Sequence, residues 1–183
     1  MRNGWQNEIL TFWFEELTAE EWFAGGSELD AKIKDRFSGL YDELKANLDP
    51  RSIEDARTAL AAIIALDQFP RNIYRGQPAA FGTDNVAIEI ARNAVDKGFD
   101  HGLSKDEKQF LYMPFMHSEI SADQERCVDL FRALDNEDGL KYAIEHRDIV
   151  QQFGRFPHRN KALGRETSDA EHKFMEGHAG YGQ

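Results

Sequence analysis

Two similar runs of the sequence carry side chains that bind negatively charged groups or transfer protons. The first is DQFPRN at residues 67–72, and the second is RFPHRN at residues 155–160. Each run continues to a glycine four residues after its asparagine. Arginine presents a planar set of N–H donors to carboxylates and phosphates, and histidine changes its charge near neutral pH. If these two Phe-Pro runs lie side by side, they predict a polar pocket.

Asp67 lies where a negative charge is unfavourable. It takes the next position on the apolar face of a predicted helix, a face formed by Ala56, Leu60, Ile63 and Ile64. Burial penalises a carboxylate, and the carbonyl end of a helix repels it. A cation is therefore expected beside Asp67, and the candidates are Arg71, Arg75, Arg155 and Arg159. If the two Phe-Pro runs lie side by side, a guanidinium group of the opposite run can bind Asp67 through two hydrogen bonds.

Two histidines lie in comparable positions. His146 belongs to a predicted helix, residues 136–153, that is apolar on two sides and is therefore expected to be buried. His117 follows Pro114, which kinks or ends its helix, so His117 and Glu119 are free to point into a groove. A buried ion pair or histidine also has a purely structural interpretation. Three such clusters in one chain nevertheless favour one shared pocket.

These clusters supply the candidate site residues. The candidate general bases are Asp67, His117 and His146. The candidate ligand-binding residues are the polar side chains of the two Phe-Pro runs and their continuations: Arg71, Asn72, Arg75, Arg155, His158, Arg159, Asn160 and Arg165.

The composition disfavours several other functions. With 22 basic and 33 acidic side chains, the net charge of -11 repels nucleic-acid backbones. No apolar run approaches the roughly 20 residues of a membrane span, and residues 1–10 lack a signal-peptide pattern. We therefore expect a cytoplasmic protein without nucleic-acid or membrane partners. No metal or cofactor motif is present, and the single cysteine, Cys127, is expected in the core.

Apolar residues recur at helical spacing along nearly the whole chain, which predicts an all-α protein. Short loops make consecutive helices antiparallel neighbours, so we expect one domain, residues 1–183, of stacked antiparallel helical hairpins. Residues 177–183 are rich in glycine and are expected to fray. About eight helices are predicted: residues 5–17, 27–46 and 52–68 with Ser52 as the cap, one capped by Thr83 or Asp84 and closed by Gly98, one from Ser104, one from Ser121, residues 136–153, and one from Ser168. Ser104 with Glu107, Ser121 with Gln124 and Ser168 with Glu171 have the spacing of a capping box.

The blocks that carry these residues resemble those of the bacterial family called Domain of Unknown Function 924. The resemblance implies a fold similar to tetratricopeptide repeats and implies no activity. Members usually begin the last helix with a Ser-Thr-x-Glu-Glu-like sequence, whereas residues 166–171 read ETSDAE, so a different cap is expected there. The matching blocks are residues 9–14 (ILTFWF), 67–75 (DQFPRNIYR), 117–119 (HSE), 123–126 (DQER), 146–149 (HRDI), 153–160 (FGRFPHRN) and 163–165 (LGR).

Three functions fit these residues. We favour a binding module whose arginine and histidine side chains hold a small anionic molecule or a peptide. In the alternative, a hydrolase-type enzyme, Asp67, His117 or His146 acts as the general base, and Arg155 or Arg159 stabilises negative charge. In the third, purely structural interpretation, the charged blocks only lock two hairpins together. The sequence predicts no oligomeric state.

Overall fold

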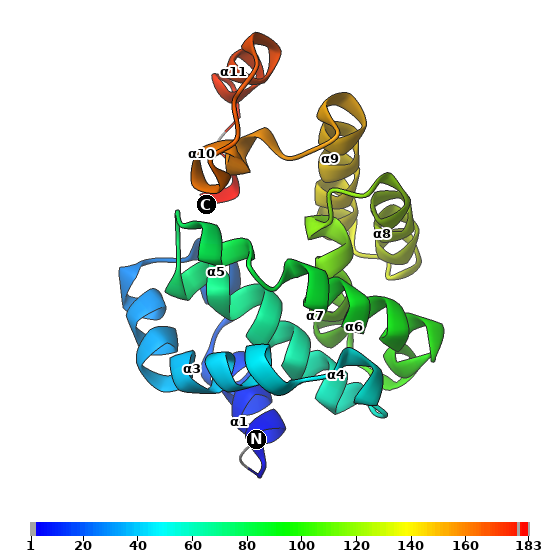
Figure 1. The fold of residues 1–183 in the computed structure, drawn as a ribbon. Coiled ribbons are helices and arrows are strands. Elements are labelled where there is room, and N and C mark those ends of the chain that lie inside the picture. Colours follow the sequence, from blue (N-terminus) through cyan, green and yellow to red (C-terminus); the bar gives the residue numbers. More distant parts are fainter. Residues whose placement is uncertain (1–2, 179, 183) are drawn as a thin grey trace.

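The computed structural model describes residues 3–178 and 180–182, and these residues form helices and connecting turns without a strand. The predicted all-α fold is therefore confirmed (Figure 1). The α-helices are α1 (Trp5–Thr11), α2 (Ala19–Ala24), α3 (Ser27–Asn47), α4 (Ala56–Ile63), α5 (Phe69–Ile73), α6 (Asp84–Asp96), α7 (Lys105–His117), α8 (Ser121–Ala133), α9 (Glu137–Phe153), α10 (Asn160–Leu163) and α11 (Asp169–Met175).

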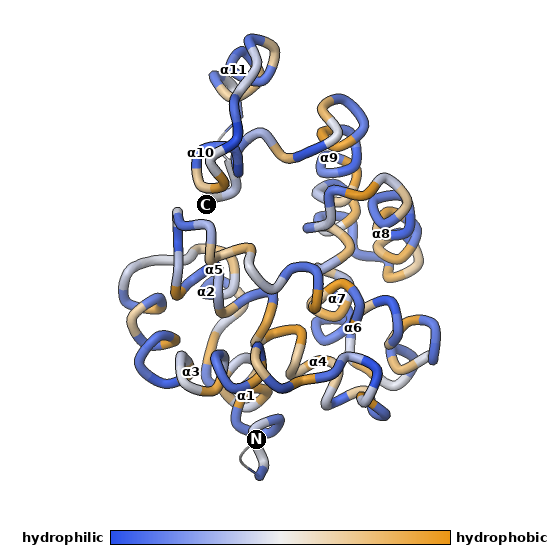
Figure 2. Tube along the Cα trace, viewed as in Figure 1, coloured by the Kyte–Doolittle hydropathy of each residue, from blue (hydrophilic) through white to orange (hydrophobic). Residues whose placement is uncertain are grey.

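The helices stack as neighbours along the chain. Helix α7 packs against α8, α8 packs along α9, and α3 lies along α5. One main cluster of buried apolar residues extends from Trp5 in α1 to Ala143 in α9. Polar and apolar positions alternate along these helices, as amphipathic helices require (Figure 2). None of the described helices is long and apolar enough to cross a membrane.

Helix starts follow the predicted capping signals at most places. Ser104 and Ser168 each form a capping box with a glutamate three residues later, and Asn136 caps α9. The third predicted helix begins at residue 56 rather than 52, because Asp55 accepts a hydrogen bond from the N–H of Thr58 and so caps α4. The box expected at Ser121 is absent from the described structure, where Ile120 precedes α8 without a side-chain cap.

The third predicted helix also continues beyond Pro70, where the sequence predicts an end. A π-helical segment, residues 64–68, separates α4 from α5, and Pro70 lies in the first turn of α5. A first-turn proline is tolerated because its missing N–H would have no partner within the helix. The wider π turn therefore lets the chain pass from Ile63 to Ile73 without a break. Inserted π turns are frequent at functional sites.

The chain after α9 forms a C-terminal arm, residues 156–182, that lies over the α5 end of the molecule (Figure 1). Gly154, with a φ of 71°, ends α9 in a left-handed conformation that glycine adopts without strain. The sequence predicts that residues 177–183, which include the end of this arm, fray. Ala179 and Gln183 lie outside the described residues, whereas the ring of Tyr181 stacks on His146 with centroids 4.2 Å apart.

Candidate functional site

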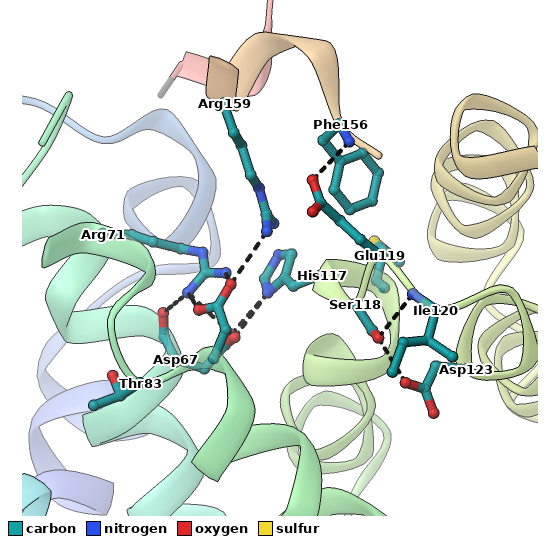
Figure 3. A network of polar contacts seen from close by, with 12 residues as sticks. Asp67, Arg71, Thr83, His117, Ser118, Glu119, Ile120, Asp123, Phe156 and Arg159 are labelled. Atoms are coloured by element: carbon teal, nitrogen blue, oxygen red, sulfur yellow. Dashed lines mark hydrogen bonds and ion pairs between the residues drawn. The ribbon is translucent and has the colours of Figure 1, made fainter. Parts of the chain in front are cut away.

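Asp67 lies at the centre of a polar network and is fully buried (Figure 3). Both of its carboxylate oxygens are 2.9 Å from Nδ1 of His117. Oδ1 also lies 3.2 Å from a guanidinium nitrogen of Arg71, and Oδ2 accepts a hydrogen bond of 2.5 Å from the amide of Gln68. Asp67 faces inward, as the sequence predicts, and has a set of compensating partners. The predicted helix end at Asp67 is wrong, because the helix continues through the π-helical segment into α5.

Arg71, one of the four candidate cations, pairs with Asp67. It belongs to the same Phe-Pro run and lies four residues later. The predicted pair of hydrogen bonds from the opposite run is wrong, because Arg159 of that run pairs with Asp84 instead. Burial raises the pKa of Asp67, but Arg71 and then His117 outweigh burial and hold this pKa at about 2. Asp67 is therefore a carboxylate throughout the physiological pH range.

The two Phe-Pro runs do meet, at Asp84, the first residue of α6. Arg71 of the first run lies 3.0 Å from Asp84, and Arg159 of the second run lies 3.2 Å from it. These arginines hold equivalent positions, each directly before the asparagine of its run. Arg159 also lies over the rings of Phe81 and Phe156, and burial lowers its pKa to about 10, which leaves it protonated at neutral pH.

His117 is the last residue of α7 and is mostly buried. Burial and then Arg71 lower its pKa, and together they outweigh the opposing effect of Asp67. His117 is therefore a neutral imidazole at pH 7. The neutral ring has one N–H, and the carboxylate of Asp67 accepts it from Nδ1. Nε2 then carries a lone pair and has no hydrogen-bond partner among the described residues.

The turn between α7 and α8 holds His117 in place. The side-chain amide of Gln124 donates to the backbone oxygens of Phe115, Met116 and Ser118, at 3.2, 2.8 and 2.6 Å. The predicted role of Gln124 in a capping box is therefore wrong, because its side-chain amide donates hydrogen bonds to backbone oxygens on either side of His117. The sequence does not identify this role, since it depends on how two helices pack.

A second histidine cluster lies where the C-terminal arm meets α9. Nδ1 of His146 hydrogen bonds the backbone oxygen of Tyr142 at 2.8 Å, and the His146 ring packs between Phe156 and Tyr181. His158 lies against the same two aromatic rings. Burial lowers the pKa of both histidines to about 3. Both are neutral at pH 7.

The remaining predicted binding residues pair with protein carboxylates. Arg165 pairs with Glu119, whose carboxylate also accepts a hydrogen bond from the backbone N–H of Phe156. Arg155 binds Glu171 through two hydrogen bonds of 2.7 and 2.8 Å. These pairs join the C-terminal arm to the turn after α7 and anchor α11. Asn72 and Arg75 both donate to Asp30 of α3. Asn160 differs, since its side-chain oxygen accepts a hydrogen bond from Arg165.

A cavity of about 710 Å³ lies beside this network. Its lining includes most of the predicted residues, namely His117, His146, Arg71, Asn72, Arg75, His158 and Arg159. Asp67 lies behind His117, outside the lining, and Arg155, Asn160 and Arg165 are also outside it. Most of the predicted imidazole and guanidinium groups therefore share one cavity. Within the described residues, no group of three His, Cys, Asp or Glu side chains is arranged to hold a metal ion.

Comparisons with known proteins agree with this architecture. A family model described as "Bacterial protein of unknown function (DUF924)" matches residues 9–179. A solved structure of a protein of unknown function from Agrobacterium tumefaciens is similar to this chain, with a TM-score of 0.84 and 38% sequence identity. That match covers 93% of this chain and 96% of the other. Among curated proteins, none matches the chain.

Proposed function

Because the chain belongs to the DUF924 family of bacterial proteins of unknown function, we propose a function from the site itself: a hydrolytic enzyme with His117 as its general base. The observation that carries this proposal is the pair formed by Asp67 and His117. Nδ1 of His117 lies 2.9 Å from both carboxylate oxygens. A carboxylate in that position selects the tautomer with its lone pair on Nε2, and it stabilises the imidazolium that forms on proton uptake.

The same arrangement keeps the base in its unprotonated form. A general base must be unprotonated at the working pH to accept a proton. Burial and Arg71 keep His117 neutral, so Nε2 is ready to accept a proton at pH 7. Arg71 and Arg159 lie within the same cavity and are fixed by Asp84. They are placed to stabilise negative charge that develops on a substrate oxygen.

The proposed reaction uses water as the nucleophile. Nε2 of His117 removes a proton from the water molecule while the water oxygen forms a bond to the carbonyl carbon of an ester or amide. The bond from that carbon to the leaving group then breaks, and the imidazolium returns its proton to the leaving oxygen or nitrogen. The products are a carboxylic acid and an alcohol or amine, and His117 ends neutral as it began.

A non-catalytic binding module for a small anionic molecule is the second candidate. Arg71 and Arg159 favour it, because both line the cavity and the Nε atom of each is buried without a hydrogen-bond partner in the described structure. The charge balance weighs against it. The five predicted arginines, Arg71, Arg75, Arg155, Arg159 and Arg165, pair with five carboxylates, Asp30, Asp67, Asp84, Glu119 and Glu171. A locally neutral site attracts an anion weakly.

Hydrolysis of a panel of small esters and amides tests the proposed function. We expect His117→Ala to lower kcat/KM by roughly 100- to 10,000-fold, the usual contribution of a general base. His101→Ala is the matched control, because His101 is 86% exposed and lies far along the chain from the pair. Its kcat/KM should equal that of the unaltered protein.

The pH dependence provides a second readout. Because the pKa of His117 is lowered, the rate should hold as the pH falls to about 6.5, the ordinary value for histidine, and decline only below it. Equal rates for His117→Ala and the unaltered protein would reject the proposal. Tight binding of small carboxylates or phosphates without hydrolysis of any ester or amide would favour the binding module.

We also propose a cytoplasmic location, a likeness of the stacked hairpins to tetratricopeptide repeats, and the absence of a nucleic-acid partner. The net charge of -11 supports the last of these. Co-sedimentation with nucleic acid at low salt would contradict the last of them.

A further inference from the structure

Two large apolar side chains are exposed at the cavity. Phe23 in α2 is 61% exposed and Tyr142 in α9 is 51% exposed, and both belong to the cavity lining. Only two other large apolar side chains are exposed among the described residues, Ile120 and Leu163, and these lie outside the lining. Exposed apolar groups that converge on one concave surface are typical of ligand-binding sites.

A stripe along α7 leads from this aromatic region to His117. Gln109, Met113, Met116 and His117 all line the cavity. Residues at positions i, i+4, i+7 and i+8 form one stripe about 100° wide along a helix. Eight residues of α-helix span about 12 Å, so the two methionines form an apolar wall between Gln109 and the proposed base. Methionine side chains adapt to apolar groups of varied shape.

The aromatic side of the cavity is held in place before any ligand binds. The indole N–H of Trp22 donates to the backbone oxygen of Trp13 at 2.7 Å, and the ring of Phe23 stacks on Phe110. Gly25 ends α2 with a φ of 62°, and a Cβ atom there would lie 3.3 Å from the guanidinium of Arg75. A glycine at this position allows Arg75 to approach the turn closely. Phe23 is therefore presented at the cavity by a braced helix.

From these contacts we infer the class of substrate: a small ester or amide with an uncharged apolar arm on its acyl side. This inference rests on the proposed function, since the reacting carbonyl must lie next to the water molecule that Nε2 of His117 activates. The arm then follows Met116 and Met113 outward and ends between Phe23 and Tyr142. A cavity of about 710 Å³ is of the size that holds a small molecule. The reaction is the hydrolysis described above, with water as the second reactant.

Binding of unbranched methyl ketones, from butanone to nonanone, tests the arm separately from catalysis. A ketone keeps the carbonyl and the arm but has no bond that hydrolysis can break. Calorimetric titration should show Kd falling by roughly two- to fourfold with each added methylene group, as apolar burial requires. In Phe23→Ala, the Kd of the longer ketones should no longer decrease with chain length, whereas the Kd of the shortest ketone should be unchanged. Ile120→Ala, which shortens a similarly exposed side chain outside the lining, should keep the full gain.

A Kd that is constant along the ketone series would overturn the inference. The inference would also be overturned if Kd decreased with chain length equally steeply in Phe23→Ala and in the unaltered protein. Phe23 is largely exposed, so its removal leaves the folded core intact. If Kd falls along the series but no ester or amide is hydrolysed, the apolar site is supported and His117 as a base is rejected. If hydrolysis occurs but Kd does not fall, the catalytic proposal stands and the apolar arm is rejected.

Discussion

Asp67 carries a full negative charge inside the protein, and two groups of different kinds contact its carboxylate. Arg71 is a permanent cation, whereas His117 is neutral and offers one N–H. Removing the carboxylate leaves Arg71 buried with Asp84 as its only carboxylate partner among the described residues. The cost of an incompletely paired charge in the interior is large.

At this scale we predict that Asp67→Ala lowers the free energy of unfolding by roughly 3 kcal/mol or more, because it breaks a buried ion pair. Urea denaturation of both proteins measures the change. Asp129→Ala is the control, since Asp129 pairs with Arg132 on the surface, and exposed pairs contribute about 0–1 kcal/mol. An Asp67→Ala protein as stable as the control would contradict the role of this carboxylate in holding the network.

The sequence predicts part of this network and misses the rest for a physical reason. Helical periodicity is enough to show that Asp67 faces inward. Periodicity does not show whether the guanidinium group that pairs with Asp67 lies four residues away or on the distant Phe-Pro run, because either group can reach the carboxylate. Asp84 was considered only as a helix cap. Its use as the common partner of Arg71 and Arg159 depends on the position of α6 against α5, which no local pattern encodes.

At the scale of elements, the turn between α7 and α8 positions the proposed base. Gln124→Met keeps the side-chain volume but removes the donor to three backbone oxygens around His117. We expect a loss of about 1–3 kcal/mol of unfolding free energy, the cost of buried acceptors left without a donor. We also expect kcat to decrease by a larger factor than the factor by which KM changes, because a displaced base affects the chemical step more than substrate binding.

The control for this prediction is Gln151→Met, since Gln151 donates to Glu125 on the surface of α9. Both its stability and its kcat should stay close to those of the unaltered protein. A Gln124→Met protein with an unchanged kcat and a reduced stability would give Gln124 a structural role only.

The helix starts at Ser104, Asn136 and Ser168 were predictable, because each of these side chains accepts a hydrogen bond from a backbone N–H three residues later. The start of α4 was not, since Asp55 caps it rather than the predicted Ser52. The prediction failed at Pro70, where a π turn realigned the helix so that proline became a first-turn residue. Proline ends a helix in most local contexts, and the sequence alone does not indicate an inserted turn. The short helix α2 and its capping box were missed as well.

At the scale of the whole molecule, two buried histidines couple stability to pH. Burial lowers the pKa of His146 and His158 to about 3, whereas in an unfolded chain the value is near 6.5. Below pH 6.5 the unfolded chain therefore binds protons that the folded protein does not. Their contribution to stability is complete above pH 6.5 and is lost progressively as the pH falls toward 3.

We predict that Tm drops by several degrees between pH 7 and pH 5, and that His158→Phe has a smaller drop, because a phenyl ring fits the aromatic contacts without binding a proton. Scanning calorimetry at both pH values measures this. His101→Ala, at an exposed histidine, should keep the full drop. An equal drop in all three proteins would show that these buried histidines do not cause it. Asp67, with its pKa held at about 2, adds a separate loss only below about pH 3.8.

The stacked helices as a whole were predictable, because amphipathic periodicity and short loops leave few other arrangements. The position of the C-terminal arm was not. The apolar cluster that it shares with α9 is small, with Ile149, Val150 and Phe156 as the buried members, and polar pairs such as Arg165 with Glu119 join the arm to the rest. Ion-pair partners far apart in sequence cannot be matched from composition.

The arm has a consequence for how the protein is made. A ribosome releases α1–α9 before the segment that carries His158, Arg159 and Tyr181, and chains begin to fold from the N-terminal side during synthesis. Until that segment emerges, Asp84 has Arg71 but lacks Arg159, and one wall of the cavity is missing. The cavity is therefore incomplete in a nascent chain that ends at α9, and we expect any hydrolytic activity to require the segment that carries Arg159.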